Sequence, residues 1–340
     1  MSTSKKDFTP EDLANGFSAA AKYRGFDGTD AEAPPVGYVT IAMSTQGNMN
    51  APAFIYARSF KSREMTQLAL VQQDKLAENN VRLIRSVSHQ DVSPSTWHIN
   101  EVIEFLLKHY IAFFGDILQD MAWPVNDDDL KYLQANSPEE FDAYKKGDYV
   151  PRVNIPSSSL KFLDLEKPVK NIVLKSKEGT FAFRMPQFGD LITLQTFLNA
   201  EFASQDAQFE DVVNRYKENP SSVSKQEQEA YEDYVSDRLE VATDVNTALL
   251  LASVDGQPVE SLDEALRLVM EDPRFDYGLN QALRDEVDKV SATFGPDPEI
   301  TLENPITGKL ETRRFSFRLY DIFQAIRLSR SSRYDIKVES

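Results

Sequence analysis

The chain has no cysteine among its 340 residues. Disulfide bonds, thiolate catalysis and zinc sites built from cysteine are therefore excluded, so packing and hydrogen bonds must hold the fold. Hydrophobic residues make up 41% of the chain, including 21 Phe and 13 Tyr, which is enough apolar material for a sizeable core. A chain of this length is expected to form about two domains or one elaborate one.

Residues 295–317, GPDPEITLENPITGKLETRRFSF, predict a β-hairpin. The sequence PITG at 305–308 supplies a turn in which Gly308 is free to take a positive φ. The frame is similar to a zinc-ribbon hairpin, in which two cysteines would stand at Asn304 and Thr307. Because these ligands are missing, we expect apolar side chains to anchor the turn by burial, each Phe or Leu contributing roughly 1.5–3 kcal/mol. The apolar residues that share a face of either strand are Ile300, Leu302, Phe315, Phe317 and Leu319.

The charge of the chain is strongly acidic and unevenly distributed. The formal net charge is −17 and the pI about 4.7, so the surface as a whole repels phosphate and nonspecific binding of nucleic acid is not expected. Residues 201–300 hold 24 Asp and Glu against 8 Lys and Arg, whereas residues 301–340 hold 5 acidic and 8 basic residues. Such a chain could dock head to tail or bind a basic partner through its acidic third, and a solvated helical face explains the same charge.

No membrane span or secretion signal is predicted. The most apolar run, residues 102–118, contains Glu104, Lys108, His109 and Asp116, which is typical of a buried helix and not of a bilayer-spanning one. The N-terminal sequence MSTSKKDFTPEDLANG has no apolar core of signal-peptide length. Together with the absence of cysteine, this favours a reducing cytoplasm.

Hydrophobic periodicity and turn signals predict an α+β chain that is mainly helical, with N-terminal strands, a central β-hairpin and a zinc-less, ribbon-like hairpin at the C-terminal end. The capping-box pattern S-x-x-E at Ser224 and Ser261 predicts two helix starts. The expected strands lie within 37–57 and 169–185, and the expected helices at 62–86 (with Asn79-Asn80 as a candidate break), 99–121, 127–133, 138–146, 190–202, 206–218, 225–251, 262–270 and 277–293.

The pattern also predicts how the chain is divided. Residues 1–36 are polar and without sustained period, and we expect them to form an extended arm. The Pro- and Ser-rich segment 150–159 is expected to be a linker. It would separate a domain at 37–149, with the strand pair and helices, from one at 160–340 that holds both hairpins.

The sequence contains few features that indicate catalysis. No metalloprotease, Walker A, dinucleotide-binding or nucleophile-elbow motif is present. His98 and Glu101 share a helix face and could contact one metal, but His109 lies about 16 Å further along that helix at 1.5 Å per residue. We therefore interpret His98 as a helix-start residue and predict no catalytic, cofactor-binding or metal-binding residue. A metal-dependent hydrolase centred on His98, Glu101 and Asp127 stays open as an alternative.

The order of five segments along the chain is a further feature. These segments are ARSFKSREMTQLAL (57–70), FLLKHYIAFFGD (105–116), RMP (184–186), LLLASVDGQPVESLDEALRLV (249–269) and PDPEITLENPITGKLETRRFSFRLYDIF (296–323). In this order of elements the chain resembles the baseplate-hub and tail-assembly proteins of contractile-tailed bacteriophages. The last segment departs from that family, because its pair of cysteines is absent here. The departure removes a metal-binding role and leaves the structural role of the hairpin.

The resemblance implies a virion assembly protein that is not an enzyme: a baseplate-hub subunit or a tail-assembly chaperone. Its implied partners are other tail or baseplate proteins, with self-association also open, and neither nucleic acid nor a membrane. Its implied location is the host cytoplasm during assembly, with the virion tail as a further place. The residues expected to bind a partner are Phe315, Phe317, Ile322 and Phe323. An acidic adaptor that binds basic partners through residues 201–300, in a salt-dependent way, is the alternative.

Overall fold

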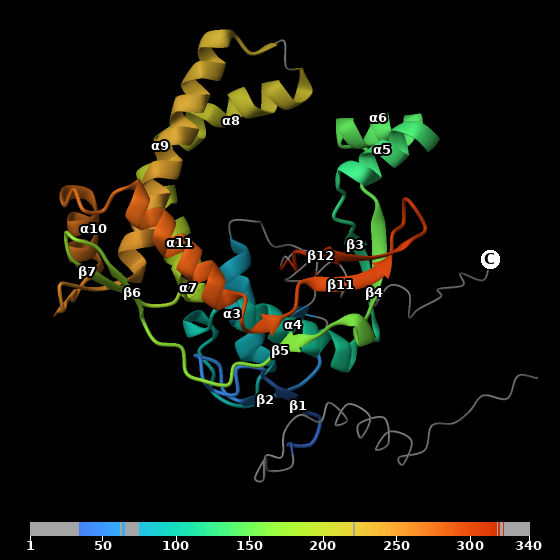
Figure 1. Ribbon diagram of the computed structural model, residues 1–340, viewed down its shortest axis with the longest axis horizontal. Helices are drawn as coiled ribbons and strands as arrows, with labels where there is room; N and C mark the ends of the chain where they lie inside the picture. Colours follow the sequence, from blue (N-terminus) through green and yellow to red (C-terminus); the bar gives the residue numbers. More distant parts are fainter. Residues whose placement is uncertain are drawn as a thin grey trace, which may run out of the picture.

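The computed structural model describes residues 34–61, 63–64, 75–219, 222–317, 319 and 322. Its helices and small antiparallel sheets form an α+β fold (Figure 1). The helices are α3 (Leu76–Val87), α4 (Ile99–Phe113), α5 (Asp127–Asn136), α6 (Pro138–Lys146), α7 (Phe188–Glu201), α8 (Ala203–Glu218), α9 (Lys225–Leu250), α10 (Leu262–Glu271) and α11 (Tyr277–Ser291), with the short 3-10 helices η2 (Pro94–Thr96) and η3 (Ser157–Ser159). The strands are β1 (Val39–Ala42), β2 (Phe54–Ala57), β3 (Ile117–Ala122), β4 (Arg152–Pro156), β5 (Phe162–Leu163), β6 (Ile172–Lys175), β7 (Thr180–Phe183), β8 (Leu251–Val254), β9 (Gln257–Pro258), β10 (Gly295–Pro296), β11 (Glu299–Glu303) and β12 (Leu310–Arg314).

Most of the buried apolar side chains in the described ranges belong to two clusters. The first gathers side chains from β1, β2, α3, α4, β3, β4 and the β11–β12 pair. The second lies between the β6-β7-β8-β9 sheet and the helices α10 and α11, with the C-terminal end of α9. β5 pairs antiparallel with β10, with Leu163 opposite Gly295. The residues of the second cluster therefore lie, in sequence, between two strands that are neighbours in space.

Local pairing follows the sequence pattern. β1 pairs antiparallel with β2, β6 with β7, and β11 with β12. The start signals also act as predicted: Ser224 accepts a hydrogen bond from the backbone N–H of Glu227 in a full capping box at the start of α9. Pro138 opens α6, and Gly147 ends it with a φ of +81°, a backbone conformation that glycine adopts without steric cost.

Three predictions about the N-terminal half need correction. α3 runs without a break through Asn79-Asn80. The helix expected at 99–121 ends at Phe113, and Ile117–Ala122 form strand β3 instead. The segment 150–159 is not a linker, because β4 lies within it and pairs with β3. An apolar run alone does not distinguish a helix from a buried strand, and here Gly115, with a φ of +141°, separates the two.

The division into 37–149 and 160–340 stays a prediction. In the packing, however, Ile300 and Phe315 from the C-terminal hairpin belong to the same buried cluster as Ile55 and Phe105. The hairpin therefore completes the core that begins near the N-terminal end of the described chain.

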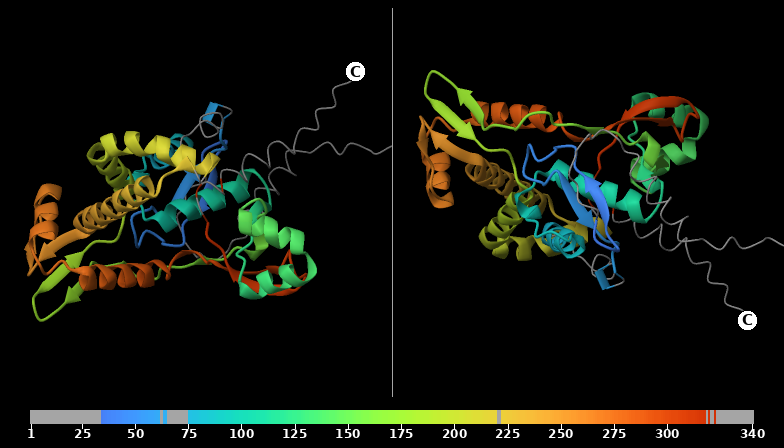
Figure 2. Two further views of the ribbon diagram at one scale, coloured as in Figure 1. Left: turned by 90° about the horizontal axis from the view of Figure 1, so that it is seen from above. Right: turned by 90° about the horizontal axis from the view of Figure 1, so that it is seen from below.

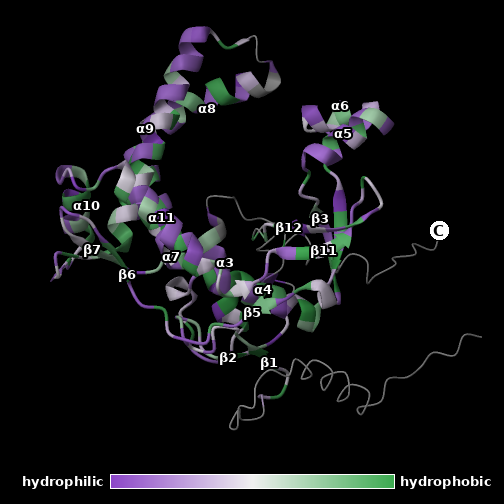
Figure 3. Cartoon of the chain, viewed as in Figure 1, coloured by the Kyte–Doolittle hydropathy of each residue, from purple (hydrophilic) through white to green (hydrophobic). Residues whose placement is uncertain are grey.

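Two helical projections extend from the base of the molecule, which α3, α4, β1 and β2 form. In Figure 1, α8 and the N-terminal part of α9 rise at the upper left, and α5 with α6 at the upper right, above α3, α4, β1 and β2. The views from above and below keep the two projections apart (Figure 2). Coloured by hydropathy, α9 is largely hydrophilic along its projecting part, whereas α4 in the base is rich in hydrophobic residues (Figure 3). Within the described ranges, no helix combines the length and apolarity needed to cross a membrane.

Candidate protein-binding surfaces

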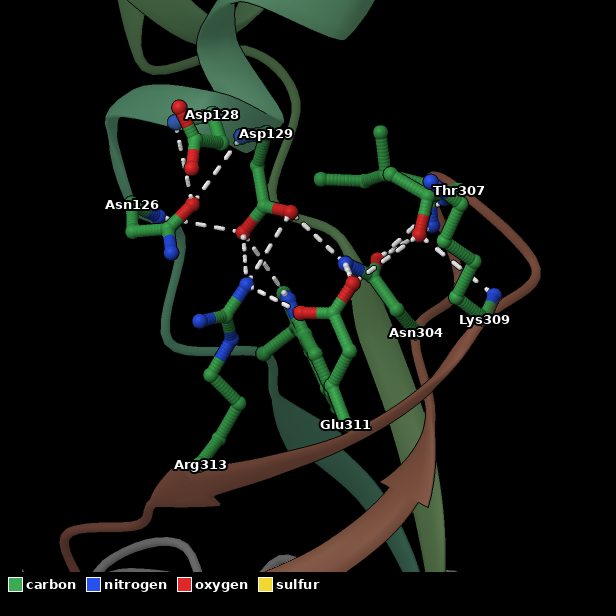
Figure 4. Close-up of polar contacts among 10 residues, drawn as sticks. Asn126, Asp128, Asp129, Asn304, Thr307, Lys309, Glu311 and Arg313 are labelled. Carbon is green, nitrogen blue, oxygen red and sulfur yellow. Dashed lines mark hydrogen bonds and ion pairs between the residues drawn. The ribbon is translucent and has the colours of Figure 1, made fainter.

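The turn of the β11–β12 hairpin is organised by one buried amide. The Asn304 side chain is fully buried, and its Oδ1 accepts hydrogen bonds from the backbone N–H groups of Ile306 at 2.8 Å and Thr307 at 3.3 Å. Its Nδ2 donates to Oδ1 of Asp129 at 2.6 Å (Figure 4). The side chain at a position where a zinc ribbon would have cysteine therefore ties the turn to helix α5 by hydrogen bonds.

Asp129 is the centre of this polar cluster. Its carboxylate is 1% exposed and accepts hydrogen bonds from Trp123 Nε1 at 3.3 Å and from the Asn126 backbone N–H at 3.1 Å. The Arg313 guanidinium from β12 pairs with it at 3.3 Å and also with Glu311. Four separate donors thus converge on one carboxylate, which satisfies a buried charge that would otherwise be costly.

The apolar residues predicted to bind a partner lie inside the chain. Phe315, Phe317 and Ile322 are 3%, 7% and 0% exposed and belong to the first core, and Phe323 lies outside the described residues. Their burial is the anchoring role expected for the cysteine-free hairpin. In the folded chain, a partner at this hairpin would instead meet outward residues such as Leu310, which is 75% exposed.

Two buried carboxylates of α4 bind the loop between β1 and β2. Glu101 accepts hydrogen bonds from Thr45 Oγ1 at 2.9 Å and from the Ala51 backbone N–H at 3.0 Å. Glu104 accepts from the backbone N–H and the hydroxyl of Ser44, at 2.7 and 2.6 Å. Burial raises the pKa of Glu101, an effect that its backbone hydrogen bonds oppose. Both carboxylates therefore act as structural acceptors.

His98 is the N-cap of α4, as the sequence predicted. Its Nδ1 accepts a hydrogen bond from the Asn100 backbone N–H at 3.1 Å, and Glu101 completes the capping box. Its Nε2 lies 3.2 Å from Ser291 Oγ. Within the described part of the chain, no polar contact of His98 involves Asp127, which is exposed at the start of α5. No group of three or more His, Asp and Glu side chains there is placed to hold a metal ion.

The projecting helices α8 and α9 share a small aromatic core of their own. Phe209 stacks on Tyr234 with ring centroids 4.9 Å apart and contacts Tyr231 at 5.7 Å. Phe202, at the start of α8, contacts Tyr234 at 5.9 Å. These four residues lie on one side of each helix and hold the two helices together. We call the unit formed by α8 and by α9 up to Asp244 the α8–α9 arm.

Ion pairs at both ends of the arm fix its geometry. Near its base, Arg238 pairs with Asp206. Although burial opposes the change, hydrogen bonds from Arg238 and Tyr234 lower the pKa of Asp206. Near its tip, Arg215 pairs with Asp211 at 2.8 Å and with Glu227 at 2.6 Å. These ion pairs, together with the aromatic core, join the two helices of the arm to each other.

Replacing Phe209 by alanine should open the arm without unfolding the body. The side chain is 8% exposed, and removing it from the aromatic cluster should cost about 3 kcal/mol of local stability. Hydrogen exchange should therefore accelerate in α8 and the first half of α9, while α4 keeps its protection. Tyr216→Ala on the same helix, where the side chain is 49% exposed, is the matched control. Unchanged exchange in Phe209→Ala would contradict the assignment of this core.

No family model matches the chain, and no curated protein or solved structure matches it either.

Proposed function

We propose that this protein is a bacteriophage baseplate-hub subunit or tail-assembly chaperone, which acts by binding other tail proteins. The phage assignment is supported by the order of the five sequence segments between residues 57 and 323. In this proposal the protein works in the host cytoplasm while tails assemble, and the hairpin formed by β11 and β12 has a structural role.

The single observation that carries a binding function is the exposure of α9. The helix is 26 residues long, yet its buried residues are confined to its C-terminal end: Val245, Thr247, Ala248 and Leu250. Helices in proteins owe most of their stability to packing of an apolar face. Here the first part of α9 has no buried residue and is joined to α8 through Tyr231 and Tyr234, while α9 also contacts α7. The part of α9 before Val245 lies outside both clusters and offers a surface to another protein.

An acidic adaptor for basic partners is the second candidate. The observation that favours it is the concentration of charge, with 24 acidic and 8 basic residues between 201 and 300. The two candidates differ in how their complexes respond to salt. Attraction between exposed charges is largely screened at high ionic strength, whereas burial of apolar surface is not.

Affinity purification of the tagged chain from cells that naturally produce it tests the proposal. We expect tail or baseplate proteins to be recovered, identified by mass spectrometry, and to remain bound through a high-salt wash. Recovery of basic host proteins alone, released by salt, would overturn the phage proposal in favour of the adaptor. Deleting residues 296–340 is a poor test, because it removes Ile300 and Phe315 from the core.

A further inference from the structure

The side of α9 next to its contacts with α8 carries exposed apolar side chains. Tyr231, Tyr234 and Arg238 contact α8. Val235 and Leu239 are 41% and 69% exposed. They are four residues apart, so they are neighbours on the helix surface, and by helical spacing Leu239 lies about a quarter turn away from the contacts with α8. Nothing in the described chain covers this pair.

Carboxylates without cation partners surround the apolar pair. By helical spacing Glu232 shares the face of Leu239, Glu240 lies at its edge, and Asp233 and Asp237 extend the acidic surface beyond Glu240. All four are exposed, and among the ion pairs of the described residues none involves any of them. Among the described side chains of the arm, the cations pair with other carboxylates: Arg215 with Asp211 and Glu227, Lys225 with Glu229, and Arg238 with Asp206.

Asp244, one helical turn after Glu240, also indicates an excess of negative charge on this part of α9. The pKa of Asp244 is raised, first by burial and then by the like charge of Glu240. A carboxylate that had a nearby cation would instead be held in its charged form. The surface formed by Glu232, Val235, Ser236, Leu239 and Glu240, which we call the outer face of α9, therefore combines an apolar centre with unbalanced negative charge.

We propose that the outer face of α9 binds a basic amphipathic helix of a partner protein. The apolar side chains of such a helix would cover Val235 and Leu239, and its lysines or arginines would pair with Glu232 and Glu240. Helix-on-helix recognition of this kind uses apolar anchors at helical spacing and charges at the edges. The inference rests on the proposed protein-binding function and assigns the chemical class of its partner.

Charge favours a basic helix over a second copy of the chain or nucleic acid as the partner of the outer face of α9. A second copy of the chain brings a net charge of −17 and is repelled at long range. Nucleic acid is repelled by the same carboxylates. A basic helix is attracted, and it also has the apolar side chains that the exposed Leu239 requires.

A designed helical peptide, with leucines at helical spacing and lysines at the remaining positions, serves as the probe. Its binding to the full chain is measured by fluorescence anisotropy. Leu239→Ser should weaken binding roughly tenfold, because a covered leucine is lost. The double variant Glu232→Lys/Glu240→Lys should weaken it at least as much. The controls are Met270→Ser, at a side chain 71% exposed on α10, and Asp285→Lys/Asp288→Lys, at two exposed positions of α11. Both controls should change binding less than about twofold.

Equal weakening by the two double variants would overturn the inference, because it would show attraction to the net charge alone. An unchanged affinity in Leu239→Ser would do the same. The proposed function is tested separately, by purifying the Glu232→Lys/Glu240→Lys chain from producing cells. If tail proteins are still recovered with that variant, the proposed function stands and this inference fails. If wild type recovers no tail protein, the proposed function fails.

Discussion

Lowering the pH from 6.5 to 4 is expected to destabilise the fold by roughly 3 kcal/mol for each of two buried histidines. Burial lowers the pKa of His98 and of His109 from 6.5 to about 4. Above pH 6.5 both imidazoles are neutral in the folded and the unfolded chain. Below it the unfolded chain takes up protons that the folded chain resists, so stability falls until the pH reaches about 4. The sum approaches the total stability of a typical domain, and we expect acid unfolding within this window.

The surroundings of His109 explain why protonation is so costly there. Its Nε2 lies 2.8 Å from the carbonyl oxygen of Arg58, while Nδ1 is buried without a partner. The ring packs against the tilted rings of Phe60 and Phe113, with centroids 4.2 and 4.8 Å away. A charged imidazolium would need a second acceptor that this apolar pocket does not supply. The raised pKa of Glu101 acts in the opposite sense, because falling pH removes the cost of keeping that buried carboxylate ionised.

Acid titrations followed by circular dichroism test this expectation. His98→Asn keeps an N-cap residue, and His109→Phe keeps an aromatic ring in the pocket, so both should remain folded to lower pH than wild type. His89→Asn, which replaces the exposed third histidine, is the control and should unfold with wild type. Acid transitions of His98→Asn and His109→Phe that coincide with wild type would contradict the account.

Asp129→Ala should destabilise the protein by about 3 kcal/mol. The substitution leaves the Trp123 indole N–H without its acceptor, leaves the Asn304 amide with Glu311 alone, and removes a charge partner of Arg313. Because this cluster joins α5 to the hairpin, the loss should appear in global unfolding by urea. Asn304→Ala, which removes the organiser of the turn, should cost roughly 1–3 kcal/mol.

The neighbouring residue provides the control for this prediction. The Asp128 side chain is 86% exposed and pairs with Lys131 at 3.1 Å, and exposed pairs of this kind contribute little. Asp128→Ala should therefore change the free energy of unfolding by less than about 0.5 kcal/mol. If Asp129→Ala and Asp128→Ala unfolded at the same urea concentration, the buried cluster would not be what holds the hairpin.

The elements with local signals are the ones that sequence predicts well. Ser224 with Glu227, and Pro138 with Gly147, mark helix ends through the backbone groups they satisfy or the φ angles they adopt. His98 as a helix start belongs to the same class. These interactions reach only a few residues, so a single chain segment contains all the information needed.

The parts that sequence does not predict depend on distant partners. Strand β3 exists because β4 pairs with it: Leu118 lies opposite Ile155, which is 37 residues later in the chain. Asn126 and Asp129 have the spacing of a capping box, which the sequence offers, but the link from Asp129 to Asn304 joins residues 175 positions apart.

The same reasoning applies to the predicted partner-binding residues. An apolar stripe such as that of Phe315 and Phe317 indicates that something covers it, and the chain itself does so here. By contrast, Leu239 lies in a mostly polar helix, and its exposure depends on which side of α9 contacts α8, which the local sequence does not specify. Binding surfaces of this type are set by which face the rest of the fold leaves uncovered.

Hydrogen exchange of the chain alone and in complex with its co-purified partner tests the central claim, that the α8–α9 arm is the binding element. If the arm binds the partner, exchange along α9 between Lys225 and Asp244 should be slower in the complex, with the amides of β11 and β12 unchanged. Slower exchange confined to the β11–β12 hairpin, with α9 unaffected, would contradict it and return partner binding to the C-terminal hairpin.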